Sequence, residues 1–119
     1  MPDIDELLPL TPAVFHILLV LADQERHGYS IMQEVQTLTG GQVKMGPGTL
    51  YGTIKRMLQM QLIEETEDRP DPDLDDQRRR YYRLSALGHR VLRAEAQRLE
   101  SLVDVARKRE ILGGGSVAL

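Results

Sequence analysis

The segment from Gly46 to Leu58 limits the fold of this chain more than any other. It begins with Gly-Pro-Gly, a turn sequence, because glycine tolerates unusual backbone angles and proline does not fit deep inside a helix. Apolar residues then recur three and four positions apart, which predicts a helix with one buried stripe: Leu50, Ile54, Met57 and Leu58. The opposite side carries Gly52, Lys55 and Arg56. Such a small, positively charged outer face fits a DNA groove. The alternative is an ordinary core helix whose outer side faces only solvent.

Composition restricts the remaining choices. At 119 residues the chain is long enough for one domain with a real core, and the absence of cysteine excludes disulfides and thiolate chemistry. The first residues are acidic, and the longest apolar run, 17–22, is far shorter than the roughly 20 residues of a membrane helix, so we expect a cytoplasmic protein. Because the net charge is -3, contact with nucleic acid requires local concentrations of positive charge.

Two helices are expected before Gly46. Thr11 is a capping hydroxyl followed by proline, so the first helix should run from Pro12 to about Asp23. The second, expected at residues 29–38, ends at a pair of glycines. This second helix and the one that starts near Gly46 are joined by a glycine-containing link, which is the outline of a helix-turn-helix.

Two strands are expected after the third helix. Residues 62–66 read as a strand, and residues 79–84 read as its return, with Tyr82 and Leu84 facing inward. The connection at residues 67–77 is acidic and too long for a tight hairpin. Three helices followed by a two-stranded hairpin predict a winged helix-turn-helix.

The last helix should run from Ala86 to about Arg109, with Ser85 as its cap. Its apolar residues are spaced alternately four and three apart, as in a coiled-coil seam: Leu92, Ala96, Leu99, Val103 and Ala106. The rest of this helix is charged, so the seam needs a partner surface, and a second copy of the chain is the simplest one. We expect the N-terminal arm to pack on a partner as well, through Leu7 and Leu8.

These elements define the expected organisation of the chain. The fold class is mainly α with a small β-hairpin, a winged helix-turn-helix plus a long C-terminal dimerisation helix. The N-terminal arm would cover residues 1–10, the DNA-binding domain residues 11–84, the dimerisation helix residues 85–112 and a disordered tail residues 113–119.

Hydroxyls and cations near the third helix and on the wing can hold phosphates or reach base edges. Three consecutive arginines on the wing also suit phosphate contact or minor-groove insertion, and the alternative is that they pair with the neighbouring aspartates. The predicted DNA-binding residues are Lys44, Gly48, Thr49, Tyr51, Gly52, Lys55, Arg56, Arg78, Arg79 and Arg80.

The sequence indicates neither a metal site nor catalysis. Aspartates at 71, 73 and 75 match the first ligands of an EF-hand loop, but Asp76 and Tyr82 stand where that loop needs glycine and glutamate. The three histidines are far apart, and phosphate-binding, dinucleotide-binding and nucleophile motifs are lacking. We expect no enzyme activity, no metal and no cofactor.

An ordered set of motifs resembles the PadR family of transcriptional regulators. The set comprises His27-Gly28-Tyr29, Gly48-Thr49-Leu50-Tyr51, Lys55-Arg56, Leu62-Ile63 and the run from Arg79 to Ser85 with Gly88. The resemblance implies a homodimeric repressor whose third helix enters the major groove while its wing follows the backbone or the minor groove. This sequence departs from the family at Gly52, where proline is frequent, and at Gln61, where glycine commonly ends the helix. It also lacks the tryptophans with which some relatives stack flat ligands.

We therefore expect a sequence-specific repressor that binds double-stranded DNA as a homodimer on an inverted repeat. A winged-helix module for protein contact, without DNA binding, is the alternative. A further hypothesis is release by a small aromatic effector in a pocket lined by Phe15, Met32 and Leu99, for which ordinary core packing is the competing interpretation.

Overall fold

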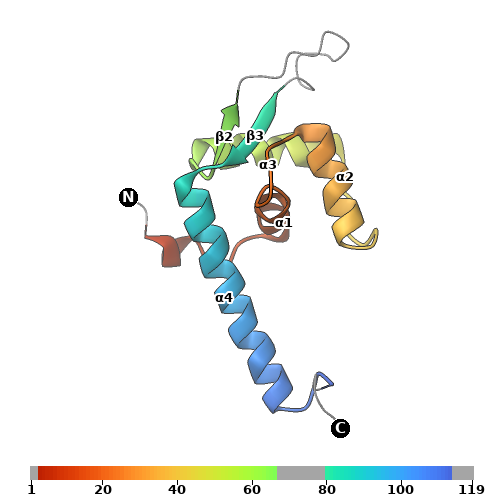
Figure 1. Cartoon of the computed structure of the whole chain (residues 1–119), viewed down its shortest axis with the longest axis vertical. Coiled ribbons are helices and arrows are strands. Elements are labelled where there is room, and N and C mark those ends of the chain that lie inside the picture. The colour runs from red at the N-terminus through yellow and green to blue at the C-terminus, as the bar shows by residue number, and fades with distance from the viewer. Residues whose placement is uncertain (1–2, 67–79, 114–119) are drawn as a thin grey trace.

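The computed structural model describes residues 3–66 and 80–113. The elements are η1 (Ile4–Leu7), α1 (Pro12–Val20), β1 (Arg26–His27), α2 (Gly28–Leu38), α3 (Pro47–Gln59), β2 (Ile63–Thr66), β3 (Tyr81–Leu84) and α4 (Ala86–Lys108). Figure 1 shows α1 in the middle of the molecule and α4 extending from the sheet past it into open space. This arrangement is the expected winged helix with a long last helix.

Local signals set the helix boundaries. The Thr11 hydroxyl accepts the Val14 amide at 3.3 Å, and the Ser85 hydroxyl accepts the Gly88 amide at 2.9 Å, as expected for N-caps. At the other end, α1 stops at Val20, before the expected Asp23. The Arg26 Nε donates to the Val20 carbonyl at 2.9 Å, replacing the bond that another helical turn would supply.

The expected two-stranded hairpin is in fact a three-stranded antiparallel sheet with the order β1-β3-β2. Arg26 pairs with Tyr82 and His27 with Tyr81, so the short segment before α2 adds a strand to the wing. The His27 Nδ1 also accepts the Ser30 amide at 3.0 Å, and its ring meets the Tyr81 ring edge-on at 5.4 Å. His27 therefore connects the sheet to the start of α2.

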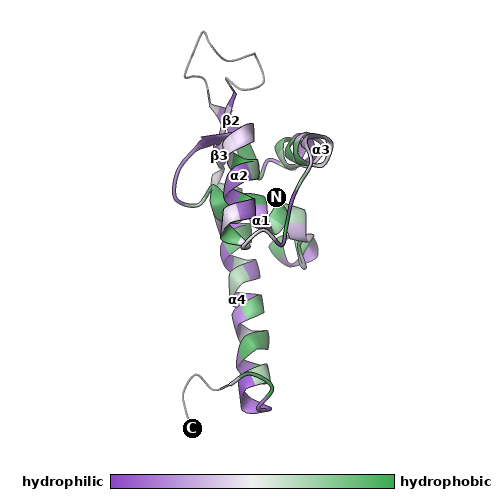
Figure 2. Ribbon diagram, turned by 90° about the vertical axis from the view of Figure 1, so that its right-hand side faces the viewer, coloured by the Kyte–Doolittle hydropathy of each residue, from purple (hydrophilic) through white to green (hydrophobic). Residues whose placement is uncertain are grey.

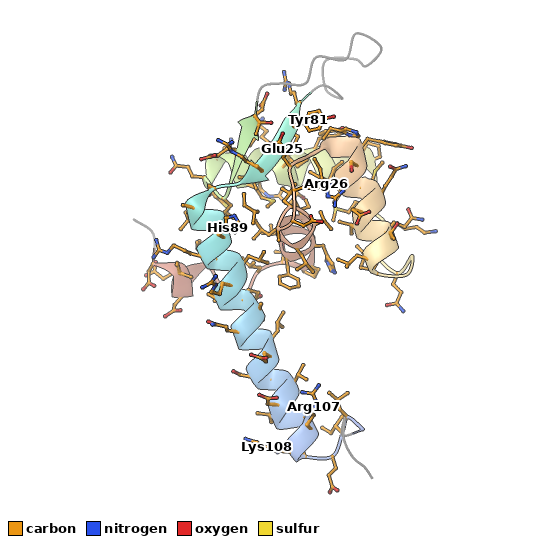
Figure 3. All side chains as sticks on the ribbon, in the orientation of Figure 1. Glu25, Arg26, Tyr81, His89, Arg107 and Lys108 are labelled. Atoms are coloured by element: carbon orange, nitrogen blue, oxygen red, sulfur yellow. The ribbon has the colours of Figure 1, made fainter. Side chains whose placement is uncertain are left out.

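Arg26 joins α1 to α2 through several contacts, and Figure 3 shows its side chain between these helices. Besides the Val20 carbonyl, its guanidinium reaches the Ser30 hydroxyl at 3.4 Å and the Asp23 carboxylate at 3.3 Å. The Arg26 side chain is only 11% exposed, so these partners satisfy donors that have little access to water.

The core forms where α1 meets α2, α3 and α4. Its fully buried side chains are mainly aliphatic, as the lack of tryptophan requires: Ile17, Leu18, Ile31, Val35, Leu50, Ile54, Met57, Leu62, Ile63 and Val91. Burying such side chains is the main favourable term in folding.

The end of α3 and the start of α4 meet in a close backbone contact. Gln61 has a φ of 62°, the conformation that favours glycine, and Leu62 donates its amide to the Met57 carbonyl at 2.9 Å. The helix is thus closed without the glycine typical of the family. A Cβ on Gly88 would lie 2.0 Å from the Leu62 carbonyl oxygen, so only glycine fits at this position.

The N-terminal arm packs on its own chain. η1 contacts α4, and Leu7 and Leu8 are half-buried against the core. The Glu95 carboxylate is 2% exposed, accepts the Leu10 amide at 2.8 Å and pairs with the Arg98 guanidinium. This buried carboxylate fixes the arm to α4 without a partner chain.

Within the described residues, none of the helices combines the length and apolarity needed to cross a membrane. The tail expected at residues 113–119 lies outside the described residues except for Gly113.

We expect Gly88→Ala to lower the free energy of unfolding by about 2–3 kcal/mol, because the added methyl group overlaps a backbone oxygen that cannot move alone. Urea unfolding at fixed protein concentration measures this. Gly52→Ala is the matched control: it also lies in a helix, its Cβ would meet nothing within 4 Å, and it should stabilise by about 0.5–1 kcal/mol. Equal effects of the two substitutions would contradict the close contact.

We expect Glu95→Gln to lower the free energy of unfolding at pH 7 by about 1–3 kcal/mol, because a charged hydrogen-bond network is lost. The hydrogen bond from Arg98 lowers the pKa of Glu95, burial opposes this shift, and the Leu10 amide supports it. The folded chain therefore binds this proton less readily than the unfolded chain.

The contribution of Glu95 should be complete above the ordinary glutamate pKa of about 4.3 and disappear as the pH falls through the lower pKa of the folded chain. Urea unfolding between pH 7 and pH 3 should show the variant and the parent protein converging in acid. The control is Glu100→Gln, an exposed position on the same helix. A gap between variant and parent that stays constant with pH would contradict this role.

Candidate nucleic-acid interface

The outer face of α3 is open to solvent. Gly48, Lys55, Arg56 and Gln59 are exposed, and Gly52 is half-buried. A Cβ at Gly48 or Gly52 would meet no atom within 4 Å, so another molecule can approach the helix backbone there. The helical periodicity thus predicted the outward direction of this face.

A buried stripe holds α3 in place. Leu50, Ile54 and Met57 are at most 2% exposed, and Thr53, which is 1% exposed, donates its hydroxyl to the Thr49 carbonyl at 2.7 Å. Because α3 packs on both α1 and α2, its outer face is rigidly supported. The cations on that face therefore have a fixed base.

Lys55 and Arg56 are adjacent in sequence but lie on different flanks of α3. Arg56 donates to the Thr53 hydroxyl at 3.3 Å. Lys55 lies with Tyr51 on the flank that faces the wing. A step of about 100° per residue produces this separation, so the two cations point in different directions from the helix.

A recess of about 410 Å³ lies between α3 and the wing. Helix α3 contributes Tyr51, Ile54, Lys55 and Leu58, and the wing contributes Glu65, Arg80 and Tyr82. Strand register explains the wing residues, because Glu65 pairs with Tyr82 and alternate residues face the same side. Arg80 is two residues before Tyr82 and reaches the same recess.

The polar groups of the recess are charged or able to donate. The Arg80 Nε lies 3.6 Å from the Glu65 Oε1, and the two side chains are 54% and 45% exposed. Burial raises the pKa of Tyr82, and the negative charge of Glu65 raises it further. The Tyr82 phenol therefore keeps its proton near neutral pH and can donate a hydrogen bond.

Gly28 determines where Tyr51 lies. A Cβ on Gly28 would lie 2.7 Å from the ring and the hydroxyl of Tyr51, so the Tyr51 ring rests directly on the first turn of α2. Sequence reasoning identified Tyr51 as a DNA-binding residue but found no role for Gly28. It placed Tyr82 on the inward side of its strand but gave neither Tyr82 nor Glu65 a role in the interface.

The remaining predicted DNA-binding residues lie at the edges of this face or beyond the described residues. Lys44 and Thr49 are exposed beside the start of α3. Arg78, Arg79 and the aspartate-rich segment lie outside the described residues, so only Arg80 of the arginine run is placed. The residues that the structure describes contain no cluster of three or more acidic or histidine side chains suited to a metal ion.

The expected dimerisation seam on α4 divides into two parts. Leu92 is 8% exposed and belongs to the core of its own chain, whereas Val103 is 37% exposed. Ala96 is exposed, and Leu99 and Ala106 are half-buried. The apolar surface is wider than the seam predicted from spacing, because Leu102 and Val105 are 53% and 45% exposed. These residues lie in the C-terminal half of α4, which extends away from the winged domain and is called its free half below. Figure 2 shows apolar and polar residues alternating along it.

The suggested effector pocket would lie between the N-terminal arm, α1 and α4, and not in the recess beside the wing. Phe15 and Met32 are half-buried against the core, and Leu99 is half-buried on α4. A pocket between the arm and α4 is lined by other residues: Asp5, Leu8, Pro9, Ala94, Gln97, Arg98 and Ser101.

Comparison with solved structures identifies the fold. The crystal structure of a PadR family transcription regulator from Clostridium difficile has a TM-score of 0.67 and 23% identity over 82% of this chain and 97% of that one. A transcriptional regulator from Clostridium thermocellum has a TM-score of 0.65 and 22% identity over 81% of this chain and 87% of that one. These two likenesses bear out the winged-helix fold.

Sequence comparison gives the family. The chain is 31% identical over 86 residues, 72% of its length, to an uncharacterized 37.1 kDa protein in transposon TN4556 of Streptomyces fradiae, of which the match spans 22%. Residues 17–94 match the model of the transcriptional regulator PadR-like family. The chain therefore belongs to the PadR-like family of transcriptional regulators.

Proposed function

We propose that this chain is a repressor that binds duplex DNA sequence-specifically as a homodimer, with α3 in the major groove and the wing on the backbone. One observation carries the proposal. The outer face of α3 exposes Lys55 and Arg56 beside two glycines, Gly48 and Gly52, at which an added Cβ would meet no atom within 4 Å. Such a surface allows backbone approach, phosphate contact and base readout at once.

The net charge of -3 does not oppose this function, because charge is distributed unevenly. Lys44, Lys55, Arg56 and Arg80 lie on or beside the α3 face, with Glu65 as the acid in the recess. Phosphate contacts depend on local cations, and two chains would present twice as many of them. A dimer therefore compensates for the acidity of the remaining surface.

The free half of α4 supports dimerisation. Leu102, Val103 and Val105 are all exposed in the single chain, and apolar side chains gathered in this way favour burial against another helix. A second copy related by a two-fold axis would cover this surface and place both α3 helices on the same side of the dimer. Two-fold symmetry in the protein corresponds to an inverted repeat in the DNA.

The proposal includes neither a cofactor nor an effector, and it places the protein in the cytoplasm with its DNA. Phe15 and Met32, two of the suggested effector residues, are half-buried against the core, which favours ordinary core packing for them.

We expect Arg56→Ala to weaken binding to the preferred duplex by about 10- to 100-fold, because one good base or phosphate contact contributes roughly 1–3 kcal/mol. Duplexes selected from a random pool supply the ligand, and fluorescence anisotropy at fixed salt measures the affinity. Lys55→Ala should weaken binding to all sequences more evenly and reduce the salt dependence, since Lys55 faces the recess beside the wing.

The matched control is Lys108→Ala, which changes the net charge equally but lies at the far end of α4, as Figure 3 shows. It should leave the affinity within about twofold. Unchanged affinity for both α3 variants, with the fold intact by circular dichroism, would contradict DNA binding through this face.

A further inference from the structure

The recess between α3 and the wing has a more specific role within the proposed DNA interface. We infer that the recess binds a single phosphodiester of the DNA backbone. Glu65 is then a positioning residue: it holds the Arg80 side chain at the recess until the phosphate takes the place of Glu65 as the partner of Arg80. This inference rests on the proposed function, because the ligand is the duplex itself.

The donors of the recess suit a phosphate. Lys55 supplies an ammonium from α3, Arg80 supplies a guanidinium from the residue just before β3, and Tyr82 supplies a phenolic hydroxyl. Guanidinium and ammonium groups form the strongest hydrogen bonds to phosphate oxygens. Ile54 and Leu58 add apolar surface on the α3 side, which suits the deoxyribose next to the phosphate.

The charge of the recess matches one phosphodiester. Lys55 and Arg80 are cations and Glu65 is an anion, so the recess has one positive charge in excess. A backbone phosphodiester carries one negative charge, whereas a terminal phosphate carries about 1.5 to 2 at neutral pH. The balance therefore favours the DNA backbone over free phosphate or a nucleotide.

The Glu65–Arg80 pair is weak enough to be exchanged. Its atoms are 3.6 Å apart and both side chains are about half exposed, so the pair contributes little to stability. It nevertheless keeps the guanidinium near the recess and reduces the free positive charge in the absence of the correct ligand. Glu65 should thus lower binding to non-specific DNA more than binding to the preferred site, where further contacts add to the affinity.

Glu64 provides an internal control one residue away. It lies opposite Arg83 in the strand register and pairs with it at 3.0 Å, on the other side of the wing from the recess. Both side chains of this pair are about half exposed, like those of Glu65 and Arg80. Glu64→Gln and Glu65→Gln therefore make the same charge change on the same strand and differ in which face they alter.

The first test measures the affinity of both variants for a non-specific duplex by fluorescence anisotropy. Glu65→Gln should bind about 3- to 10-fold more tightly than the parent protein, and Glu64→Gln should change by less than about twofold. If the two substitutions raised the affinity equally, the change in net charge alone would explain the gain, and the proposed role of Glu65 would be overturned.

The second test locates the phosphate. Neutral methylphosphonates are placed one at a time along the preferred duplex, and the parent protein should lose about tenfold in affinity at one position in each half-site. In Arg80→Ala, a neutral phosphate at that position should cost about threefold or less, since Lys55 is then the one cation of the recess that still contacts it.

An unchanged tenfold loss in Arg80→Ala would overturn the assignment of the recess while leaving DNA binding intact. If the parent protein bound no duplex at all, the proposed function would fail first, and the two failures are thereby distinguished. Circular dichroism confirms that each variant is folded before its affinity is compared.

Discussion

The contact between the first turn of α4 and the junction of α3 with β2 governs the geometry of this protein. Gly88 lies against the Leu62 carbonyl, the Ser85 hydroxyl donates to the Gln61 carbonyl at 2.6 Å, and the Ser85 amide donates to the Leu62 carbonyl at 3.1 Å. These few atoms fix the direction in which α4 leaves the winged domain. The angle between α3, the proposed DNA-binding helix, and α4, the proposed dimer helix, therefore depends on a backbone contact that allows no residue larger than glycine.

Local chemistry made much of the fold predictable. Thr11 and Ser85 cap their helices because a hydroxyl before a helical run satisfies free amides, and this signal depends on neighbouring residues alone. β1 was missed because two residues have no period, and they form a strand only through pairing with β3. The end of α1 was placed too late for the same reason, since Arg26 replaces its next turn through a contact outside the helix.

The same distinction separates the predictable part of the site from the rest. Helical period placed Lys55 and Arg56 on the outer face of α3, and both are exposed. The proximity of Glu65 to Arg80, and of Gly28 to Tyr51, arises from packing between elements distant in sequence. The recess could not be foreseen from composition, because its charge balance depends on which side of the wing each glutamate occupies. Arg78 and Arg79 lie outside the described residues, so their proposed roles are still predictions.

A dimer joined through α4 should place two α3 helices one turn of DNA apart, about 34 Å. Hydroxyl-radical footprinting of the parent protein on its selected duplex measures this arrangement directly, because protected sugars mark where each chain contacts the backbone. We expect two equivalent protected patches on one face of the duplex, separated by about 10 base pairs and related by the symmetry of the sequence. A single protected patch on an asymmetric sequence, at saturating protein, would contradict the paired arrangement.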